Sequence, residues 1–155
     1  MSESTAAGAL RRLGIELPAA PAAVGAYVPA IRAGNLAITS GQLPFKDGQL
    51  AWTGKLGSDL TVEQGYEAAR LCAINALAQL QALLSDLEKV RHVIRLEGYV
   101  HCGPGFSQHP QVLNGASELM NAVFGERGRH TRTALGINEM PLNAPVQLVV
   151  WAEVE

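Results

Sequence analysis

The strongest hydrophobic pattern in the chain begins at Thr61 and repeats every three to four residues. Thr61 and Gln64 form a capping-box pattern, in which two side chains bond the free N–H groups at the start of a helix. Apolar residues on one helix face follow for about six turns: Val62, Tyr66, Ala69, Ala73, Leu77, Leu80 and Leu84. The pattern predicts a long amphipathic helix that lies across a sheet.

From Ile94 onward the period changes to two, as in a strand with one buried face. The residues predicted to face the core are Ile94, Leu96, Gly98, Val100 and Cys102. The alternate polar side chains, from Arg95 to His101, are predicted to face solvent or a partner. The segment is therefore expected to be a half-buried strand.

Shorter patterns predict the remaining elements. Before the long helix, we expect a short helix over 5–13, strands over 27–32 and 36–40 with a tight turn at Gly34 and Asn35, and a short strand over 49–52. After it, we expect a helix over about 108–124 capped by Ser107, and strands over 131–137 and 146–153. This order predicts an α+β fold, with one sheet and both long helices on one face.

The other face of that sheet has no long helix to cover it, which favours self-association. Composition agrees, because hydrophobic residues make up 48% of the 155-residue chain and charged residues only 17%, below the usual ~25%. The length suits a single domain spanning residues 1–155. We divide it into an N-terminal extension, 1–25, and a core, 26–155.

Charge and targeting signals exclude several classes of function. The net charge of −2 argues against a nucleic-acid-binding surface, because proteins of that kind usually carry a basic excess. No apolar run is long enough to span a membrane, and Met1–Gly8 lacks a signal-peptide pattern, so a cytoplasmic location is expected. The four histidines and two cysteines lack metal-ligand spacing, and we expect no metal and no cofactor.

Arg132 is the most distinctive candidate for chemistry. On the predicted strand it shares a face with the small residues Ala134 and Gly136, which leave room around its guanidinium. A guanidinium in such a hollow is a good bidentate receptor for a carboxylate. A structural salt bridge explains the same pattern about equally well.

Several segments resemble the RidA/YjgF family, small trimeric proteins also named endoribonuclease L-PSP. The resemblance is carried by Tyr27–Pro29, Gly34–Leu36, Thr39–Pro44, Asn75–Leu80, Asn114, Thr131–Gly136 and Met140–Val146. It implies a chorismate-mutase-like α+β fold, with a single mixed sheet and two helices packed on one face. It also implies a homotrimer with a central β-barrel and three clefts between subunits.

The resemblance further implies hydrolysis of reactive 2-imino or enamine acids to 2-keto acids and ammonia, without metal or cofactor. Arg132 matches the family arginine that binds the substrate carboxylate, which makes the expected partner a small carboxylate-bearing metabolite. Tyr27 matches an aromatic residue at the cleft, Ser40 and Gly41 match the loop beside it, and Asn114 matches a recurrent helix asparagine. These residues and Ala134 are our expected substrate-binding set.

Two positions depart from the family pattern. Ala134 stands where many deaminase members have cysteine, and Gln147 stands where active members have a glutamate that positions the attacking water. Gln147 is still assigned with Arg132 to the catalytic pair, because glutamine can orient water although it cannot act as a base. His101 or His130 would replace that base only if the fold brings one of them near.

Three functions are therefore weighed. Imine or enamine deamination at an inter-subunit cleft is favoured. A non-catalytic protein that binds or senses a small carboxylate such as a 2-keto acid is the alternative. An endoribonuclease is less favoured, because RNA affinity depends on neutralising phosphates and the chain is slightly acidic.

Overall fold

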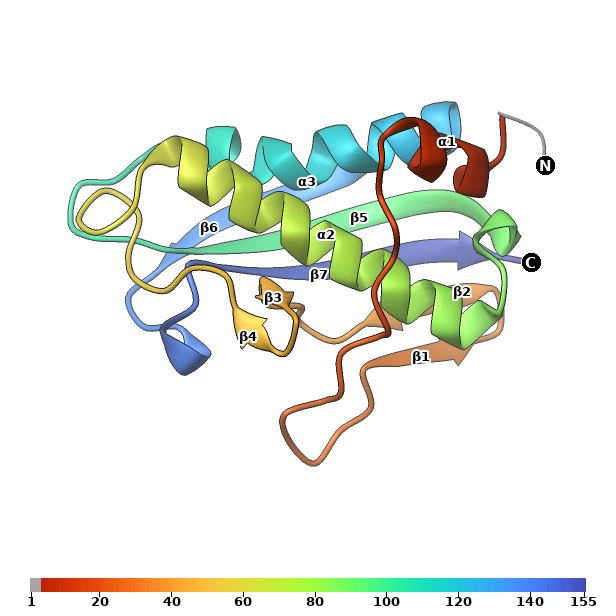
Figure 1. The fold of residues 1–155 in the computed structure, drawn as a ribbon, viewed down its shortest axis with the longest axis horizontal. Coiled ribbons are helices and arrows are strands. Elements are labelled where there is room, and N and C mark those ends of the chain that lie inside the picture. The colour runs from red at the N-terminus through yellow and green to blue at the C-terminus, as the bar shows by residue number, and fades with distance from the viewer. Residues whose placement is uncertain (1–3) are drawn as a thin grey trace.

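A five-stranded mixed sheet organises the protein (Figure 1), for which the computed structural model describes residues 4–155. Residues 1–3, part of the segment on which the expected location depends, lie outside the described part. The strand order is β1-β2-β7-β5-β6. These strands are β1 (Ala30–Ala33), β2 (Leu36–Thr39), β5 (Val90–His101), β6 (Thr131–Ile137) and β7 (Val146–Val154).

The sheet is mixed because only its last pair is parallel. Strand β6 runs parallel to β5, whereas β5, β7, β2 and β1 pair antiparallel in turn. The parallel pair is joined by a crossover through a helix, as parallel strands require. A separate two-stranded ribbon is formed by β3 (Phe45–Lys46) and β4 (Gln49–Leu50).

Two long helices cover one face of the sheet, α2 (Val62–Leu84) and α3 (His109–Phe124). The core between the layers is aliphatic and alanine-rich, and its largest fully buried members include Leu77, Leu80, Leu96, Leu113 and Leu148. The predicted α+β class, with one sheet and both long helices on one face, is confirmed. No helix among residues 4–155 is long and apolar enough to cross a membrane.

The capping box predicted for the long helix is present. The Gln64 backbone N–H donates to the Thr61 hydroxyl (3.2 Å), and the Thr61 N–H donates to Gln64 Oε1 (2.9 Å). The apolar stripe behind it packs into the core, with Ala69, Ala73 and Leu77 fully buried. Small side chains on this stripe let α2 lie close to both the sheet and α3.

Helices α2 and α3 approach each other closely at Gly115 on α3. A Cβ at this position would lie 2.0 Å from the backbone carbonyl oxygen of Tyr66 on α2. Gly115→Ala is expected to lower the free energy of unfolding by about 1–3 kcal/mol, although alanine is the better helix former, because a backbone clash forces the helices apart. Denaturant unfolding measures the difference.

Asn121→Ala, at an exposed position of the same helix, is the matched control and should change the stability by less than about 0.5 kcal/mol. Equal stability of Gly115→Ala and the wild-type protein would contradict the close packing of α2 on α3.

Several predicted boundaries and orientations are wrong. Strand β5 begins at Val90, and its register shifts between Val93 and Arg95, so Val93 takes the buried position and Ile94 is 38% exposed. A bulge of this kind interrupts the alternation, so Val93 and Leu96 are both buried although they are three residues apart, while Gly98 and Val100 keep their predicted face. His101, predicted on the solvent side, is buried.

Three other elements differ in detail. Tyr27 lies in a bend outside any strand, because β1 begins at Ala30 after Pro29. Helix α3 is capped at Gln108, not at Ser107, and without a side-chain hydrogen bond. In the β1–β2 turn only Gly34 has a positive φ, of 60°, and Asn35 does not need one.

The predicted N-terminal extension is packed against the core. Helix α1 (Ala6–Arg12), capped by Thr5, places Ala6 and Leu10 in the main hydrophobic cluster. The following segment, residues 13–29, which we call the N-terminal strap, crosses the outer side of α2 (Figure 1). Gln79 of α2 holds it through a bond from Nε2 to the carbonyl oxygen of Pro21 (2.6 Å).

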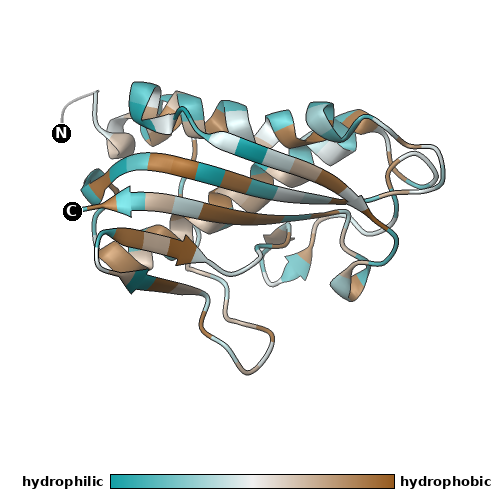
Figure 2. Cartoon of the chain, turned by 180° about the vertical axis from the view of Figure 1, so that it is seen from behind, coloured by the Kyte–Doolittle hydropathy of each residue, from teal (hydrophilic) through white to brown (hydrophobic). Residues whose placement is uncertain are grey.

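The opposite face of the sheet carries no helix (Figure 2). Its apolar side chains include the half-buried Ile38, Val149 and Trp151, and Leu135, which is 52% exposed. Between them runs a polar row in which Arg95 donates to Glu97 and Thr133. We call this surface the uncovered face.

Candidate functional site

Arg132 lies on the edge strand β6 and projects toward α3. The register pairs Arg132 with Leu96, which is fully buried beneath the helices, so both lie on the helix-covered side of the sheet. One nitrogen, Nη1, donates to Asn114 Oδ1 (2.9 Å) and to Ser117 Oγ (3.1 Å). Asn114 and Ser117 are three residues apart on α3 and therefore share a face.

The two bonds of Nη1 leave the other side of the guanidinium free. Nη1 has two hydrogens, and both are donated. Among residues 4–155, Nε and Nη2 of Arg132 have no hydrogen-bond acceptor. Burial lowers the pKa of Arg132 below its ordinary value, yet an arginine remains charged at neutral pH. A half-buried cation thus presents its Nε–Nη2 edge, the geometry that binds a carboxylate with two parallel bonds.

The hollow expected around Arg132 is only partly open. Ala134, two residues further on the same face, is small and half-buried. The space beside Gly136 is filled, because a Cβ there would meet His109 Nε2 at 2.5 Å and Cys102 Sγ at 2.9 Å. Ala134 in turn packs against the main hydrophobic cluster, so what one chain offers a ligand is the free Nε–Nη2 edge of Arg132.

His130 reaches the same group of residues. Its Nδ1 lies 2.6 Å from the carbonyl oxygen of Gly128, and its Nε2 lies 2.9 Å from Ser117 Oγ. Ser117 therefore touches both Arg132 and His130. Sequence reasoning named His130 but missed Ser117, whose only signal is its i+3 spacing from Asn114 on the predicted helix.

A second group of predicted residues lies elsewhere. Tyr27, Gly41 and Gln147 line a small pocket of about 90 Å³, together with Pro141 and Gln79. Tyr27 is 49% exposed, and its hydroxyl accepts a bond from the backbone N–H of Val24 (3.3 Å). Apart from a long contact of Nε2 with Met140 Sδ (4.0 Å), the Gln147 amide makes no hydrogen bond within residues 4–155.

Ser40 is occupied by a structural bond. Its hydroxyl donates to the Val28 carbonyl oxygen (2.6 Å), and its backbone N–H donates to the Pro29 carbonyl oxygen (2.8 Å). These bonds fasten the loop that carries Tyr27 to the end of β2. Ser40 therefore shapes the small pocket through Tyr27.

Gly41 is required by the close approach of Gln147. A Cβ on Gly41 would lie 2.4 Å from Gln147 Oε1 and 2.5 Å from its Cδ. Gly41→Ala is expected to swing the Gln147 amide out of the small pocket at a small cost in stability, because the clashing atoms belong to a flexible side chain and not to backbone. A crystal structure of the variant shows the new rotamer, and thermal unfolding gives the cost.

Gly48→Ala would not be a fair comparison, because Gly48 has a positive φ. Ala51→Gly, at an exposed position beyond the small pocket, is the control and should leave Gln147 in place. A Gly41→Ala structure with an unmoved Gln147 would refute the packing argument.

Arg132 and Gln147 project from opposite faces of the sheet. Arg132 lies in one row with Leu96 and Val150, which are buried under the helices. Gln147 is three residues from Val150 on β7, and successive side chains on a strand alternate faces. One chain therefore does not bring Gln147 to Arg132. The site assignments remain predictions, but Arg132, Asn114 and Ala134 form one half-site, and Tyr27, Gly41 and Gln147 form another.

His101 does not join the Arg132 group. It lies at the far end of β5, is 1% exposed, and neither ring nitrogen has a hydrogen-bond partner within residues 4–155. The nearest charge is the carboxylate of Glu139, 4.0 Å from Nε2. Of the two histidines considered as a replacement base, only His130 is adjacent to Arg132.

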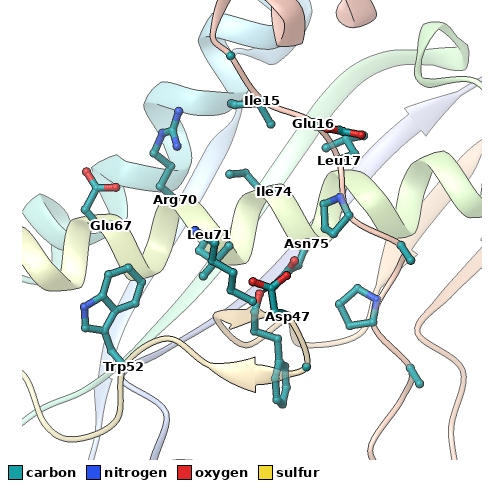
Figure 3. A pocket seen from close by; sticks show the side chains of 18 of the residues that line it. Ile15, Glu16, Leu17, Asp47, Trp52, Glu67, Arg70, Leu71, Ile74 and Asn75 are labelled. Atoms are coloured by element: carbon teal, nitrogen blue, oxygen red, sulfur yellow. The ribbon is translucent and has the colours of Figure 1, made fainter.

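A larger pocket, of about 970 Å³, contains none of the predicted site residues (Figure 3). It lies between the N-terminal strap, α2 and the β3–β4 ribbon, and Trp52, Leu71 and Ile74 supply apolar walls. Its charged side chains are of mixed sign and come from separate segments of the chain (Figure 3): Glu16, Lys46, Asp47, Glu67 and Arg70. We place the chemistry at Arg132, where polar groups converge on one cation.

Metal ligands do not gather in the described chain. Within residues 4–155, no three histidine, cysteine, aspartate or glutamate side chains come together as a metal site. Cys72 and Cys102 are both free thiols.

Comparison with known proteins agrees with the fold. The chain is 44% identical over 145 residues to Protein TCP17 of Trypanosoma cruzi, which covers 93% of this chain and 91% of that protein. A structure from Shewanella oneidensis, named a "putative endoribonuclease", has 40% identity and a TM-score of 0.94, covering 97% of this chain and 99% of that one. A protein of unknown function from Agrobacterium tumefaciens has 45% identity and a TM-score of 0.90, covering 97% and 92%.

A family described as "YjgF/chorismate mutase-like, putative endoribonuclease" matches residues 7–154. The match begins inside α1, in the segment that we had set apart as an extension, and ends at the last residue of β7. It spans the edge strand with Arg132, helix α3 with Asn114, and the β2 loop with Gly41. The chain belongs to the YjgF/chorismate mutase-like family.

Proposed function

We propose that the protein hydrolyses reactive 2-imino or enamine acids to 2-keto acids and ammonia, in a cleft between two copies of the chain. The observation that carries the proposal is the free Nε–Nη2 edge of Arg132, held in place by Asn114 and Ser117. A 2-imino acid carries a carboxylate next to its reactive carbon. Two parallel bonds to Arg132 would fix the position of that carbon beside β6.

The main task of the protein in this reaction is to orient the substrate and a water molecule. A protonated imine is already electrophilic, and positioning it against a water molecule supplies much of the rate. Gln147 suits the task of holding that water, because its amide has no strong partner in the described chain. A glutamine orients water but does not remove its proton.

The second copy is proposed because one chain separates the two half-sites. Gln147 points to the other side of the sheet from Arg132, and Tyr27 lines the small pocket together with Gln147. The uncovered face exposes Leu135 and half-exposes Val149 and Trp151, and an apolar surface of this kind is typical of an interface. A homotrimer whose sheets form a central barrel would bury it and set each Arg132 beside a neighbour's small pocket.

The test is keto-acid release from enzymatically generated 2-aminoacrylate. The wild-type protein is expected to speed the appearance of pyruvate over the spontaneous rate without added metal or cofactor. Equal rates with and without protein would refute the proposal. Light scattering on the same sample gives the number of chains per particle, for which three is expected.

A non-catalytic carboxylate-binding protein is the second candidate, and Gln147 favours it, because that position holds no general base. Pyruvate binding measured by calorimetry, without any acceleration of imine hydrolysis, would establish this alternative. The endoribonuclease named in the family description would instead show RNA cleavage that persists through nuclease-free purification. RNA binding depends on cationic side chains that contact phosphates, and the net charge of −2 disfavours such contacts.

We propose a cytoplasmic location as well. The free thiols Cys72 and Cys102 suit a reducing compartment. Fractionation of cells with an antibody to the protein tests this location, and recovery in a secreted fraction would contradict it.

A further inference from the structure

We propose that Ser117 and His130 form a proton-accepting pair beside Arg132, which activates the hydroxyl that attacks a substrate bound there. The geometry is a chain of three groups: Arg132 Nη1 to Ser117 Oγ (3.1 Å), and Ser117 Oγ to His130 Nε2 (2.9 Å). All three side chains are half-buried. The identity of the substrate rests on the proposed function, whereas the hydrogen-bonded pair itself does not.

The donor and acceptor in each hydrogen bond of the chain can be assigned, because a carbonyl oxygen can only accept and an arginine can only donate. His130 Nδ1 faces the Gly128 carbonyl oxygen at 2.6 Å. A carbonyl only accepts, so Nδ1 carries the proton and Nε2 is left with a lone pair. Arg132 can only donate, so the Ser117 hydroxyl accepts from Arg132 and gives its own hydrogen to His130 Nε2. We assign this tautomer from the network of partners.

One lone pair of the Ser117 oxygen stays free in this arrangement. A serine hydroxyl has one hydrogen and two lone pairs. His130 takes the hydrogen, and Arg132 occupies one lone pair. The remaining lone pair can accept a hydrogen from a water molecule on the Nη1 side of the guanidinium, whose Nε–Nη2 edge would hold the substrate carboxylate.

His130 is well suited to accept a proton near neutral pH. The pKa of His130 is lowered, mainly because burial removes water from the ring. The hydrogen bond to the Gly128 carbonyl raises the pKa in part, whereas the positive charges of Arg132 on β6 and His92 on β5 lower it further. The imidazole therefore stays neutral to a lower pH than an ordinary histidine. A general base in its neutral form at working pH is the condition for proton transfer.

In the reaction, the water oxygen forms a bond to C2 of the protonated imine, and the C=N electron pair moves to nitrogen. The water gives one proton to Ser117 Oγ as Ser117 passes its own to His130 Nε2, which leaves a neutral carbinolamine and an imidazolium. His130 then returns its proton through Ser117 to the amine nitrogen. The C–N bond then breaks and ammonia departs. The hydroxyl gives its proton to that ammonia and becomes the keto oxygen. The products are a 2-keto acid and ammonium.

This role explains how a chain with Gln147 would still hold a base. In the family pattern a glutamate occupies that position, and here it is replaced by an amide. His130 supplies the missing proton acceptor from the Arg132 half-site, and Gln147 of a neighbouring copy would only orient the water.

The kinetic test compares Ser117→Ala, Ser117→Thr and His130→Asn with the wild-type protein in the 2-aminoacrylate assay. His130→Asn keeps a side-chain N–H that can donate to the Gly128 carbonyl but removes the Nε2 acceptor. Ser117→Ala and His130→Asn are each expected to lower kcat by about 10²-fold, in the range of general base catalysis. Pyruvate affinity, measured by calorimetry, should not change in His130→Asn, which leaves both acceptors of Arg132 Nη1 in place, and Ser117→Thr should retain most of kcat.

The double variant should be no slower than either single variant, because residues that act as a unit are not additive. The wild-type kcat should fall as the pH drops through the lowered pKa of His130, and this inflection should be absent in His130→Asn. Unchanged kcat in the single variants of an active wild-type protein would overturn the pair and leave the proposed function intact. Loss of pyruvate binding in both variants would also overturn it, by showing a structural role.

A direct measurement separates the pair from the proposed function. Nitrogen NMR of the wild-type protein at neutral pH should show His130 protonated at Nδ1 and unprotonated at Nε2, with the titration moved when Ser117 is replaced by alanine. A proton on Nε2 at neutral pH would overturn the pair even in an active protein. The expected tautomer in a protein without imine hydrolysis would support the pair and refute only the proposed substrate.

Discussion

Replacing Arg132 with alanine is expected to abolish both carboxylate binding and 2-aminoacrylate hydrolysis. The variant loses two charge-assisted hydrogen bonds to the ligand, each contributing about 1.5–3 kcal/mol, which corresponds to about 10²–10⁴-fold in affinity. Calorimetry with pyruvate measures the loss of affinity, and the coupled 2-aminoacrylate assay measures the loss of hydrolysis rate. This is the largest effect expected of any single side chain in the protein.

Two variants control for the loss of charge. Arg132→Lys keeps the charge but not the planar fork, so it should recover only a small part of the affinity. Arg129→Ala removes a nearby exposed arginine, whose side chain contacts only Glu126 in the described chain, and should bind pyruvate like the wild-type protein. Full affinity in Arg132→Ala would place the ligand elsewhere and refute the site.

The second large effect is expected from Leu135→Arg on the uncovered face. Leu135 is 52% exposed in the single chain, so the fold of one chain tolerates the longer, charged side chain. Burying three such cations in a shared barrel is costly, because a buried charge needs a partner. The variant is therefore expected to elute as a single chain and to lose pyruvate binding, since each cleft needs a neighbour's small pocket.

Light scattering after size exclusion measures the mass, and circular dichroism shows whether the secondary structure is retained. Leu13→Arg, at a position 40% exposed at the end of α1, is the control and should leave the assembly unchanged. An intact assembly of Leu135→Arg chains would contradict the use of this face as the interface. A folded single chain that still binds pyruvate would instead contradict the two-chain cleft.

Local patterns predicted the elements best where the chain obeys one rule over many residues. The capping box at Thr61 and the stripe behind it predicted α2, because both depend only on neighbours along a helix. Strand β6 was predicted with its observed bounds of Thr131–Ile137. The start of β5 was missed, because a bulge near Ile94 changes the face without leaving a mark in the hydrophobic pattern.

The candidate site was predicted one residue at a time, but not as a constellation. Alternation along β6 set Arg132 and Ala134 on one face, and the family resemblance named Asn114. Whether Arg132 would meet a salt-bridge partner stayed open, because a strand pattern says nothing about the helix that packs against it. The structure answers with two neutral acceptors, Asn114 and Ser117.

The sequence by itself determined the class of fold, the long helices and the identity of the arginine that the family resemblance assigns to the ligand. These follow from periodicity and from short motifs, which are local properties of the chain. Only the tertiary structure decided that Ser117 and His130 meet beside Arg132, and that Gln147 lies on the other side of the sheet. Both depend on how α3, the loop before β6 and the strand register come together, and packing between distant segments has no local signature in the sequence.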